Sequence, residues 1–334
     1  MKILYAIQGT GNGHISRALE IIPHLKTRGE VDLLLSGMNY DLQIPYDIKY
    51  RLAGLSFVFG KKGGIDIWKT YQKINSLRLI REIKHLPIQK YDLVISDFEP
   101  VSSWACNKFD KPCIGLSNQV ASLSPLAPKP KHTDLLGKFV LENYAPTNPN
   151  YGLHFVNYDK NIFTPIIREE LRQVDVKNKG HYTVYLPSFD DERIVKKLKK
   201  YKDIEWEVFS KHNKKTERFK NILIQPIHNE RFLKSMSSSA GVLCNAGFGT
   251  TSEALFLEKK LMVIPMKTQY EQHCNAAVLK SMGVPVLKNL KKKHAHKMEA
   301  WLQNDKIVKV KYPDITSQIV ERIIDENVSR KLIS

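Results

Sequence analysis

Strand-like and helix-like segments alternate along nearly the whole chain, and this alternation constrains the fold more than any other feature. The first half shows strands and helices in turn, at 2–7, 15–27, 31–35, 91–96, 101–109 and 113–116. The alternation restarts in the second half, at 182–186, 205–209, 232–238, 242–245, 251–257, 261–265 and 272–282. This pattern is typical of a parallel sheet with helices on both faces. We therefore expect an α/β fold built from two Rossmann-like sheets that face each other across a cleft.

The 334 residues are enough for two domains. We expect an N-terminal domain at 1–155, a C-terminal domain at 156–310, and a last segment, 311–334, whose helix returns toward the N-terminal domain. Five prolines interrupt the pattern between residues 124 and 149, which predicts a loop or a substrate-facing segment.

The chain is strongly basic, with 52 Lys and Arg against 34 Asp and Glu. A charge of +18 favours polyanionic partners such as nucleic acid, an anionic membrane face or phosphorylated substrates. No aromatic–basic motif of a nucleic-acid-binding module is present, so nucleic acid is not the expected partner. The four cysteines are scattered, and no apolar run reaches the roughly 20 residues of a membrane span. We expect a cytoplasmic protein, either soluble or attached to the inner face of the cell membrane.

A glycine turn, Gly9-Thr-Gly11-Asn-Gly13, follows the first strand. A dinucleotide loop would need Gly-x-Gly-x-x-Gly and an acidic residue at the end of the second strand. Here the spacing is Gly-x-Gly-x-Gly, and the second strand ends in Leu-Ser-Gly37. No Gly-Lys-Ser/Thr follows, which also excludes a Walker loop. We interpret the turn as the element that presents the next residue, His14.

His14 and Asp97 both follow a predicted strand, at the edge where open α/β sheets bind their ligands. An imidazole suits general-base work on a hydroxyl near neutral pH, and a carboxylate beside it would orient the ring. Alternatively, His14 caps a helix turn and Asp97 is a helix N-cap. Asp97 and Glu99 together also resemble a metal-binding pair, but no other carboxylates cluster with them, and we expect no metal site.

A second glycine turn, Gly247-Phe-Gly249-Thr250-Thr251, combines close backbone approach with a helix N-terminus. Free N–H groups and a partial positive charge at that position suit a pyrophosphate. Glu253 has two interpretations that the residues leave open. With Thr250 it forms the spacing of a capping box, or its carboxylate accepts hydrogen bonds from a ribose diol.

These motifs resemble those of the GT-B glycosyltransferases, in particular the branch of the lipid II-forming N-acetylglucosaminyltransferases and the UDP-glycosyltransferases. The resemblance rests on four quoted segments, namely Gly9-Thr-Gly-Asn-Gly-His14, Asn245-Ala-Gly-Phe-Gly-Thr-Thr-Ser-Glu253-Ala, Met262-Val-Ile-Pro265 and Glu271-Gln272-His-Cys-Asn275-Ala. Their order and spacing match along nearly the whole chain. Gly247-Phe-Gly249 and the Glu271-Gln272 pair depart from the usual variants, which leaves the sugar open.

The resemblance implies a role for each matching position. The donor side would comprise Gly247, Gly249, Thr250 and Thr251 at the diphosphate, Glu253 at the ribose, Glu271, Gln272 and Asn275 at the sugar, and Ile227 at the uracil. His14 would be the base that activates the acceptor and Asp97 its partner. The acceptor side would include Gly11, Gly13, Glu99 and Asn118. The implied reaction is an inverting, metal-independent transfer from a UDP-sugar co-substrate to a hydroxyl, with no other cofactor.

The implied sugar is N-acetylglucosamine or another hexose, and the implied acceptor is lipid-linked or part of a cell-envelope glycan. A sugar-nucleotide epimerase of the same fold would need further acid and base groups at the donor sugar, and none is evident. A non-catalytic protein that binds nucleotide sugars or polyanions is disfavoured by the presence of both His14 and Asp97.

Residues 65–86 interleave apolar side chains at spacings of three and four with cations. This is typical of an amphipathic basic helix at an anionic membrane face, with Lys69, Lys73, Arg78 and Arg81 as the contacting cations. The alternative is an ordinary helix with a solvated cationic face.

Overall fold

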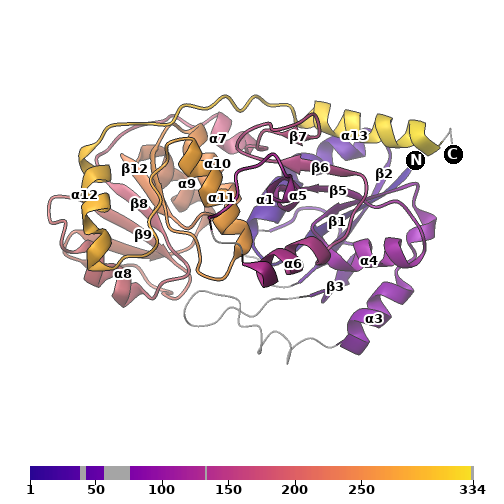
Figure 1. The fold of residues 1–334 in the computed structure, drawn as a ribbon, viewed down its shortest axis with the longest axis horizontal. Coiled ribbons are helices and arrows are strands. Elements are labelled where there is room, and N and C mark those ends of the chain that lie inside the picture. Colours follow the sequence, from indigo (N-terminus) through magenta and orange to yellow (C-terminus); the bar gives the residue numbers. More distant parts are fainter. Residues whose placement is uncertain (38–42, 56–75, 132–133, 332–334) are drawn as a thin grey trace.

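The protein contains two β-sheets flanked by helices and placed side by side, as a computed structural model of residues 1–37, 43–55, 76–131 and 134–331 shows (Figure 1). This confirms the expected α/β architecture. The first sheet has the strand order β3-β2-β1-β4-β5-β6-β7, and all of its neighbouring strands are parallel. Its strands are β1 Lys2–Gln8, β2 Glu30–Ser36, β3 Tyr50–Leu52, β4 Leu93–Asp97, β5 Ile114–Ser117, β6 Asn150–Leu153 and β7 Ile162–Phe163.

Strand β1 lies in the middle of this sheet, between β2 and β4. Its residues Ile3 to Ile7 are completely buried. A strand covered on both faces is a continuous apolar run, which explains why its position was visible in the sequence. In the parallel register Ile7 pairs with Asp97 and Gln8 pairs with Ser36. The carboxyl ends of these strands therefore bring polar side chains to one edge of the sheet.

Helices connect these strands across the faces of the sheet (Figure 1). They are α1 Asn12–Lys26, α3 Ser76–His85, α4 Pro100–Lys108, α5 Asn118–Leu123 and α6 Leu135–Asn143. Of the predicted basic helix at 65–86, residues 65–75, with Lys69 and Lys73, lie outside the part that the structure describes. Arg78 and Arg81 belong to α3.

The second sheet has the order β10-β11-β9-β8-β12-β13, and only β10 is antiparallel to its neighbour. Its strands are β8 Tyr182–Tyr185, β9 Trp206–Ser210, β10 Glu217–Phe219, β11 Ile222–Pro226, β12 Gly241–Cys244 and β13 Lys260–Val263. The accompanying helices are α7 Glu169–Arg172, α8 Asp191–Leu198, α9 Asn229–Ser238, α10 Phe248–Phe256, α11 Tyr270–Ser281 and α12 Ala295–Gln303.

The segment expected to cross between the halves carries structure of its own. Strand β7 pairs with β6 and is the edge of the first sheet. The sheet therefore continues past residue 155, where we drew the end of the first domain. The short helix α7 follows before β8 opens the second sheet.

The last helix, α13 Thr316–Lys331, lies on the first half rather than the second (Figure 1). It packs against α1. Arg28, two residues after α1, forms an ion pair with Asp325, and the hydroxyl of Tyr151 donates to Glu326 over 2.6 Å. The chain thus passes from the first half to the second and back again.

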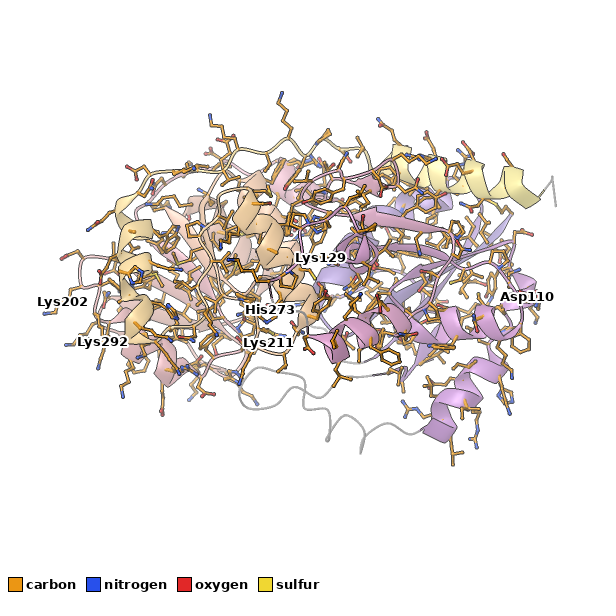
Figure 2. The ribbon with its side chains drawn as sticks, in the orientation of Figure 1. Asp110, Lys129, Lys202, Lys211, His273 and Lys292 are labelled. Atoms are coloured by element: carbon orange, nitrogen blue, oxygen red, sulfur yellow. The ribbon has the colours of Figure 1, made fainter. Side chains whose placement is uncertain are left out.

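The positive charge is spread over both halves. Figure 2 shows Lys202 and Lys292 at the end of the second half that is remote from the first, whereas Lys129 and Lys211 lie where the halves meet. No helix of the described residues has the length and apolar character needed to cross a bilayer.

Candidate active site

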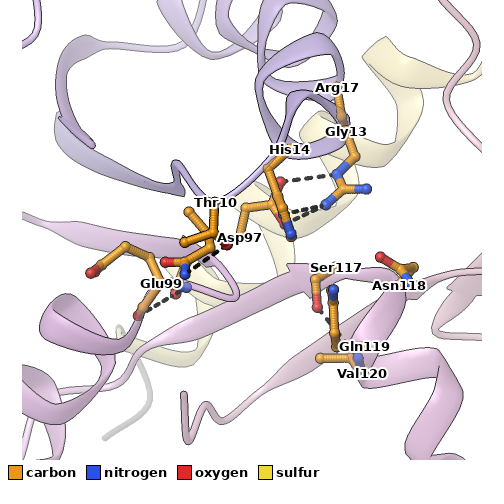
Figure 3. A network of polar contacts seen from close by, with 12 residues as sticks. Thr10, Gly13, His14, Arg17, Asp97, Glu99, Ser117, Asn118, Gln119 and Val120 are labelled. Carbon is orange, nitrogen blue, oxygen red and sulfur yellow. Dashed lines mark hydrogen bonds and ion pairs between the residues drawn. The ribbon is translucent and has the colours of Figure 1, made fainter. Parts of the chain in front are cut away.

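His14 lies in the first turn of α1, directly after the glycine turn that ends β1. Gly11 precedes this helix and has a φ of 157°, a backbone conformation that residues other than glycine rarely adopt. The turn therefore requires glycine at this position. Helix α1 then projects His14 over the carboxyl edge of the first sheet, as Figure 3 shows.

The imidazole of His14 is held by Asp97, at the end of β4. Nδ1 of His14 lies 2.9 Å from Oδ1 of Asp97. Arg17 binds the same carboxylate with two nitrogens, through Nε to Oδ2 over 3.0 Å and through Nη2 to Oδ1. In the tautomer whose Nδ1–H donates to Asp97, Nε2 of His14 is the nitrogen that can accept a proton.

These three side chains form a buried charged group. Asp97 is completely buried, Arg17 is 7% exposed, and the side chain of His14 is 15% exposed. Burial alone would raise the pKa of Asp97, but the charge of Arg17 and the hydrogen bonds from Arg17 and His14 outweigh it and lower the pKa. Burial acts to lower the pKa of Arg17, and the charge of Asp97 raises it above its usual value. Asp97 and Arg17 therefore form an ionised pair, and the carboxylate of Asp97 orients the ring of His14.

Phe98 and Glu99 complete the turn after Asp97. Phe98 has a φ of 56°, a left-handed conformation that is rare outside glycine. Glu99 is the N-cap of α4, and its carboxylate accepts the N–H groups of Val101 over 2.8 Å and Ser102 over 2.6 Å. The capping alternative for Asp97 was therefore wrong, because the cap is two residues further on.

Glu99, which we expected on the acceptor side, is held by these helix N–H groups. It is completely buried and is not among the residues that line the cavity described below. The two carboxylates of the metal-pair alternative have separate partners, because Asp97 is bound to Arg17 and Glu99 to helix N–H groups. Among the described residues, no three metal-ligating side chains come together.

A cavity of about 850 Å³ lies between the two halves of the molecule. The first half lines it with the glycine turn and with the side chains of His14, Arg17, Asn118 and Gln119. The second half contributes the carboxyl ends of its strands and two helix N-termini, through Tyr185, Pro187, Ser188, Asp190, Lys211, His212, Asn245, Gly247, Phe248, Gly249, Thr250, Met266, Gln269, Glu271 and Gln272.

The second glycine turn forms the N-terminus of α10 on the cavity wall. Gly247 is the N-cap and the helix begins at Phe248. The first-turn N–H groups of a helix have no partner within the helix and carry a partial positive charge. A Cβ placed on Gly249 would lie 3.9 Å from the Cα of Gly13, so the two glycine turns come close to contact where both line the cavity.

The capping-box interpretation of Glu253 was wrong because α10 begins earlier than expected, which puts Thr250 inside the helix. Glu253 instead accepts a hydrogen bond from Nε of Arg168 over 2.7 Å. Arg168 comes from the segment between the two sheets and also donates to Asn229 over 2.8 Å. Glu253 does not line the cavity, so its ribose role stays a prediction.

The remaining donor-side positions divide into two groups. Glu271 and Gln272, in the first turn of α11, line the cavity. Thr251, Asn275 and Ile227 do not. The hydroxyl of Thr251 donates to the backbone oxygen of Gly247 over 2.6 Å, and the amide of Asn275 donates to that of Ala246 over 3.1 Å. These two side chains fix the shape of the glycine turn from behind.

The lining residues that sequence reasoning missed include Arg17, Gln119 and Lys211. Arg17 lies one helical turn after His14, a spacing that places both on one face of α1. Gln119 adjoins Asn118, which we did single out. Lys211 directly follows β9, at the carboxyl edge of the second sheet, and this position was the available signal.

The chain is similar to known glycosyltransferases in both sequence and structure. The family model described as glycosyl transferase family 1 matches residues 1–305. No curated protein matches the chain.

Solved structures match over almost their entire length. The glycosyltransferase of kitacinnamycin has 12% identity and a TM-score of 0.59, with 99% of this chain and 98% of that chain covered. MurG of Acinetobacter baumannii has 13% identity and a TM-score of 0.54, with 97% and 99% covered. Arabidopsis thaliana UGT89C1, complexed with UDP, has 11% identity and a TM-score of 0.57, with 98% and 99% covered. These likenesses show the GT-B fold. With a family model that spans residues 1–305, the chain belongs to glycosyl transferase family 1.

Proposed function

We propose that this glycosyltransferase moves a hexose, such as N-acetylglucosamine, from a UDP-sugar to a hydroxyl acceptor with inversion at the anomeric carbon. One observation carries the proposal. An oriented histidine from the first half and the N-terminus of α10 from the second half line a single cavity of about 850 Å³. The first can remove a proton from an acceptor, and the second can bind a departing diphosphate.

The choice of a UDP donor rests on the second half of the molecule. The amide groups at the start of α10 suit a phosphate group. Lys211 and His212 line the same cavity and add cationic or hydrogen-bonding groups. Two of the structurally similar proteins, UGT89C1 and LpCGTa, were solved in complex with UDP. By analogy, UDP would bind along the carboxyl edge of the second sheet.

The proposed reaction is a direct displacement. Nε2 of His14 removes the proton from the acceptor hydroxyl, and the oxygen attacks the anomeric carbon from the face opposite the diphosphate. The bond from that carbon to the diphosphate oxygen breaks as the new bond forms, which inverts the configuration. The α10 N-terminus and Lys211 stabilise the negative charge of the leaving UDP, a task this proposal assigns to them rather than to a metal ion.

The test is to measure UDP release from a panel of UDP-hexoses with hydroxyl acceptors and a lipid extract, and to measure UDP binding separately. His14→Ala should lower transfer by a factor of about 10³ or more, while the Kd for UDP stays within about twofold. Full activity in His14→Ala would refute the role of the histidine. Release of an epimerised UDP-sugar without transfer would refute the assigned reaction.

We further propose that the acceptor is lipid-linked and that α3 binds the anionic membrane face that carries it. Leu77 is 77% exposed and Ile80 is 47% exposed, beside the cations Arg78 and Arg81. An exposed apolar pair between cations suits an interface of acyl chains and acidic headgroups.

Sedimentation with phosphatidylglycerol vesicles tests this association. Arg81→Glu should weaken vesicle binding severalfold, and Lys202→Glu, at the remote end of the second half, serves as the charge-matched control. Equal binding by both variants and the unmodified protein would contradict a role for α3.

A further inference from the structure

A pair of amide side chains from the first half holds a carboxylate from the second half. Nδ2 of Asn118 donates to Oε1 of Glu271, and Nε2 of Gln119 donates to Oε2, each over 2.9 Å. Asn118 and Gln119 are each 3% exposed, and all three residues line the cavity. Figure 3 shows the two amides at the start of α5, on the first-half wall. Both oxygens of Glu271 are thus fixed from across the cavity.

Neighbouring contacts hold both sides of this bridge in place. Ser117 caps α5, because its hydroxyl accepts the N–H of Val120 over 3.3 Å. On the other wall, the side-chain oxygen of Gln272 accepts the N–H of Met266 over 3.0 Å, which fixes the first turn of α11. The direction of the Glu271 carboxylate therefore depends on the relative position of the two halves.

The bridge leaves acceptor capacity for a ligand. Each oxygen of a carboxylate can accept two hydrogen bonds, so each oxygen of Glu271 retains one after binding an amide. Oε1 of Gln119 is buried without a hydrogen-bond partner among the described residues. A buried acceptor without a partner is costly, so the bond from Nε2 to Glu271 holds the amide of Gln119 in this orientation.

We propose that Asn118 and Gln119 are positioning residues of the donor-sugar subsite. They orient Glu271 so that its free lone pairs accept hydrogen bonds from hydroxyls of the transferred sugar. The inference rests on the proposed UDP-sugar transfer. It means that the half which binds the acceptor also takes part in recognising the donor sugar, and that this recognition requires the halves to be together.

Isothermal titration with UDP-N-acetylglucosamine, UDP-glucose and UDP tests the proposal without an acceptor. The quantity to compare is the ratio of the Kd for a UDP-sugar to the Kd for UDP, because this ratio gives the contribution of the sugar to binding. In Gln119→Leu and Asn118→Ala this ratio should rise about tenfold for the sugar that the unmodified protein prefers. The Kd for UDP itself should stay within about twofold.

A second variant separates positioning from a general structural role. Gln119→Glu places a carboxylate against that of Glu271, and two such groups share a proton as pH falls. A protonated Glu at position 119 can donate as Gln119 does. For Gln119→Glu, the ratio of the Kd for the UDP-sugar to the Kd for UDP should therefore be high at pH 8 and fall toward the value of the unmodified protein near pH 5. For Gln119→Leu the ratio should stay high at both pH values.

Asn327→Leu is the matched control. The amide of Asn327 is buried between α13 and β6, where it donates to Tyr151 over 3.1 Å, away from the cavity. Its loss should lower Tm and leave the sugar ratio unchanged. An unchanged ratio in both Gln119→Leu and Asn118→Ala, with UDP-sugar binding intact, would overturn the inference alone. Failure of the unmodified protein to bind UDP or any UDP-sugar would instead overturn the proposed function.

Discussion

Arg17 neutralises a carboxylate that has no contact with bulk water. Asp97 is completely buried, and the guanidinium contacts both of its oxygens. Arg17→Met keeps much of the side-chain volume and removes the charge. Breaking a buried ion pair from one side costs about 3–5 kcal/mol, so we expect a fall of that size in the free energy of unfolding, measured by urea denaturation.

Arg17→Lys is the control for this prediction. It keeps one positive charge but not the two-point contact, and it should recover part of the lost stability. Equal stability of Arg17→Met and the unmodified protein would show that Asp97 does not depend on the guanidinium.

The lowered pKa of Asp97 predicts a specific pH dependence of stability. A carboxyl whose pKa is lower in the folded state stabilises the fold above its unfolded pKa of about 4. That contribution is lost as pH falls through the lower folded value. Below pH 4 the free energy of unfolding should therefore fall less steeply with decreasing pH in Asp97→Asn than in the unmodified protein. Acid unfolding followed by circular dichroism measures this slope. Identical slopes would contradict the ionised pair.

The sequence predicted the meeting of His14 and Asp97 because both follow buried strands that end at one edge of the sheet. It did not distinguish Asp97 from Glu99 as the cap of α4, because that depends on the left-handed turn at Phe98. Nor did it show the partner of Glu253. Arg168 reaches that carboxylate from the connecting segment, and local spacing carries no information about such a distant contact.

At the scale of single elements, α1 and α10 begin in the same way. Gly13 and Gly249 each occupy the second helical position after a buried strand. A Cβ on Gly13 would meet no atom within 4 Å, and one on Gly249 would meet only Gly13, at 3.9 Å. Alanine therefore fits the protein at either position, and its effects should be on ligands.

Gly249→Ala and Gly13→Ala form a matched pair. Gly249→Ala should leave Tm unlowered and weaken UDP binding about tenfold, because its methyl group lies at the proposed diphosphate site. Gly13→Ala should keep UDP binding and lower transfer to the acceptor. Isothermal titration and UDP-release assays separate the two effects, and equal weakening of UDP binding by both would contradict the assigned division of the cavity.

Buried strands were the most predictable elements, because continuous apolar runs bounded by turns define them. Five strands were not predicted, namely β3, β6, β7, β10 and β11. Strands β3, β7 and β10 have only two or three residues and lie at sheet edges, so pairing with one neighbour defines them rather than a pattern of their own. Strands β6 and β11 lie inside their sheets and were missed all the same. The start of α10 was displaced because Gly247, and not a side-chain cap, begins the helix.

At the scale of the whole molecule, one apolar core includes residues of both halves and of α13. Phe155 of the connecting segment lies 5.1 Å from Phe248 of α10, measured between ring centroids. Helix α13 adds Ile319, Val320, Ile323 and Ile324, each at most 2% exposed. The helix is therefore part of the packed core, although it comes last in the chain.

Ile323→Asp tests that role. A carboxylate at a position that is 1% exposed cannot be buried without a partner, so the helix should detach or the fold should lose several kcal/mol. We expect a lower Tm by differential scanning fluorimetry and faster proteolysis after α12. Glu321→Ala, on the exposed face of α13, is the control. An unchanged Tm in Ile323→Asp would show that α13 contributes little.

The double passage of the chain between the halves has a mechanical consequence. The outgoing and returning segments are fastened together, since the hydroxyl of Tyr312 donates to the backbone oxygen of Phe155 over 3.2 Å and Arg172 donates to that of Tyr312 over 3.1 Å. Two linked tethers allow rotation about the line through them and resist twisting around any other axis. We therefore expect the two halves to open and close by a hinge rotation about the two connecting segments. Such a rotation would bring Gly13 back to the same position beside Gly249 each time the halves close.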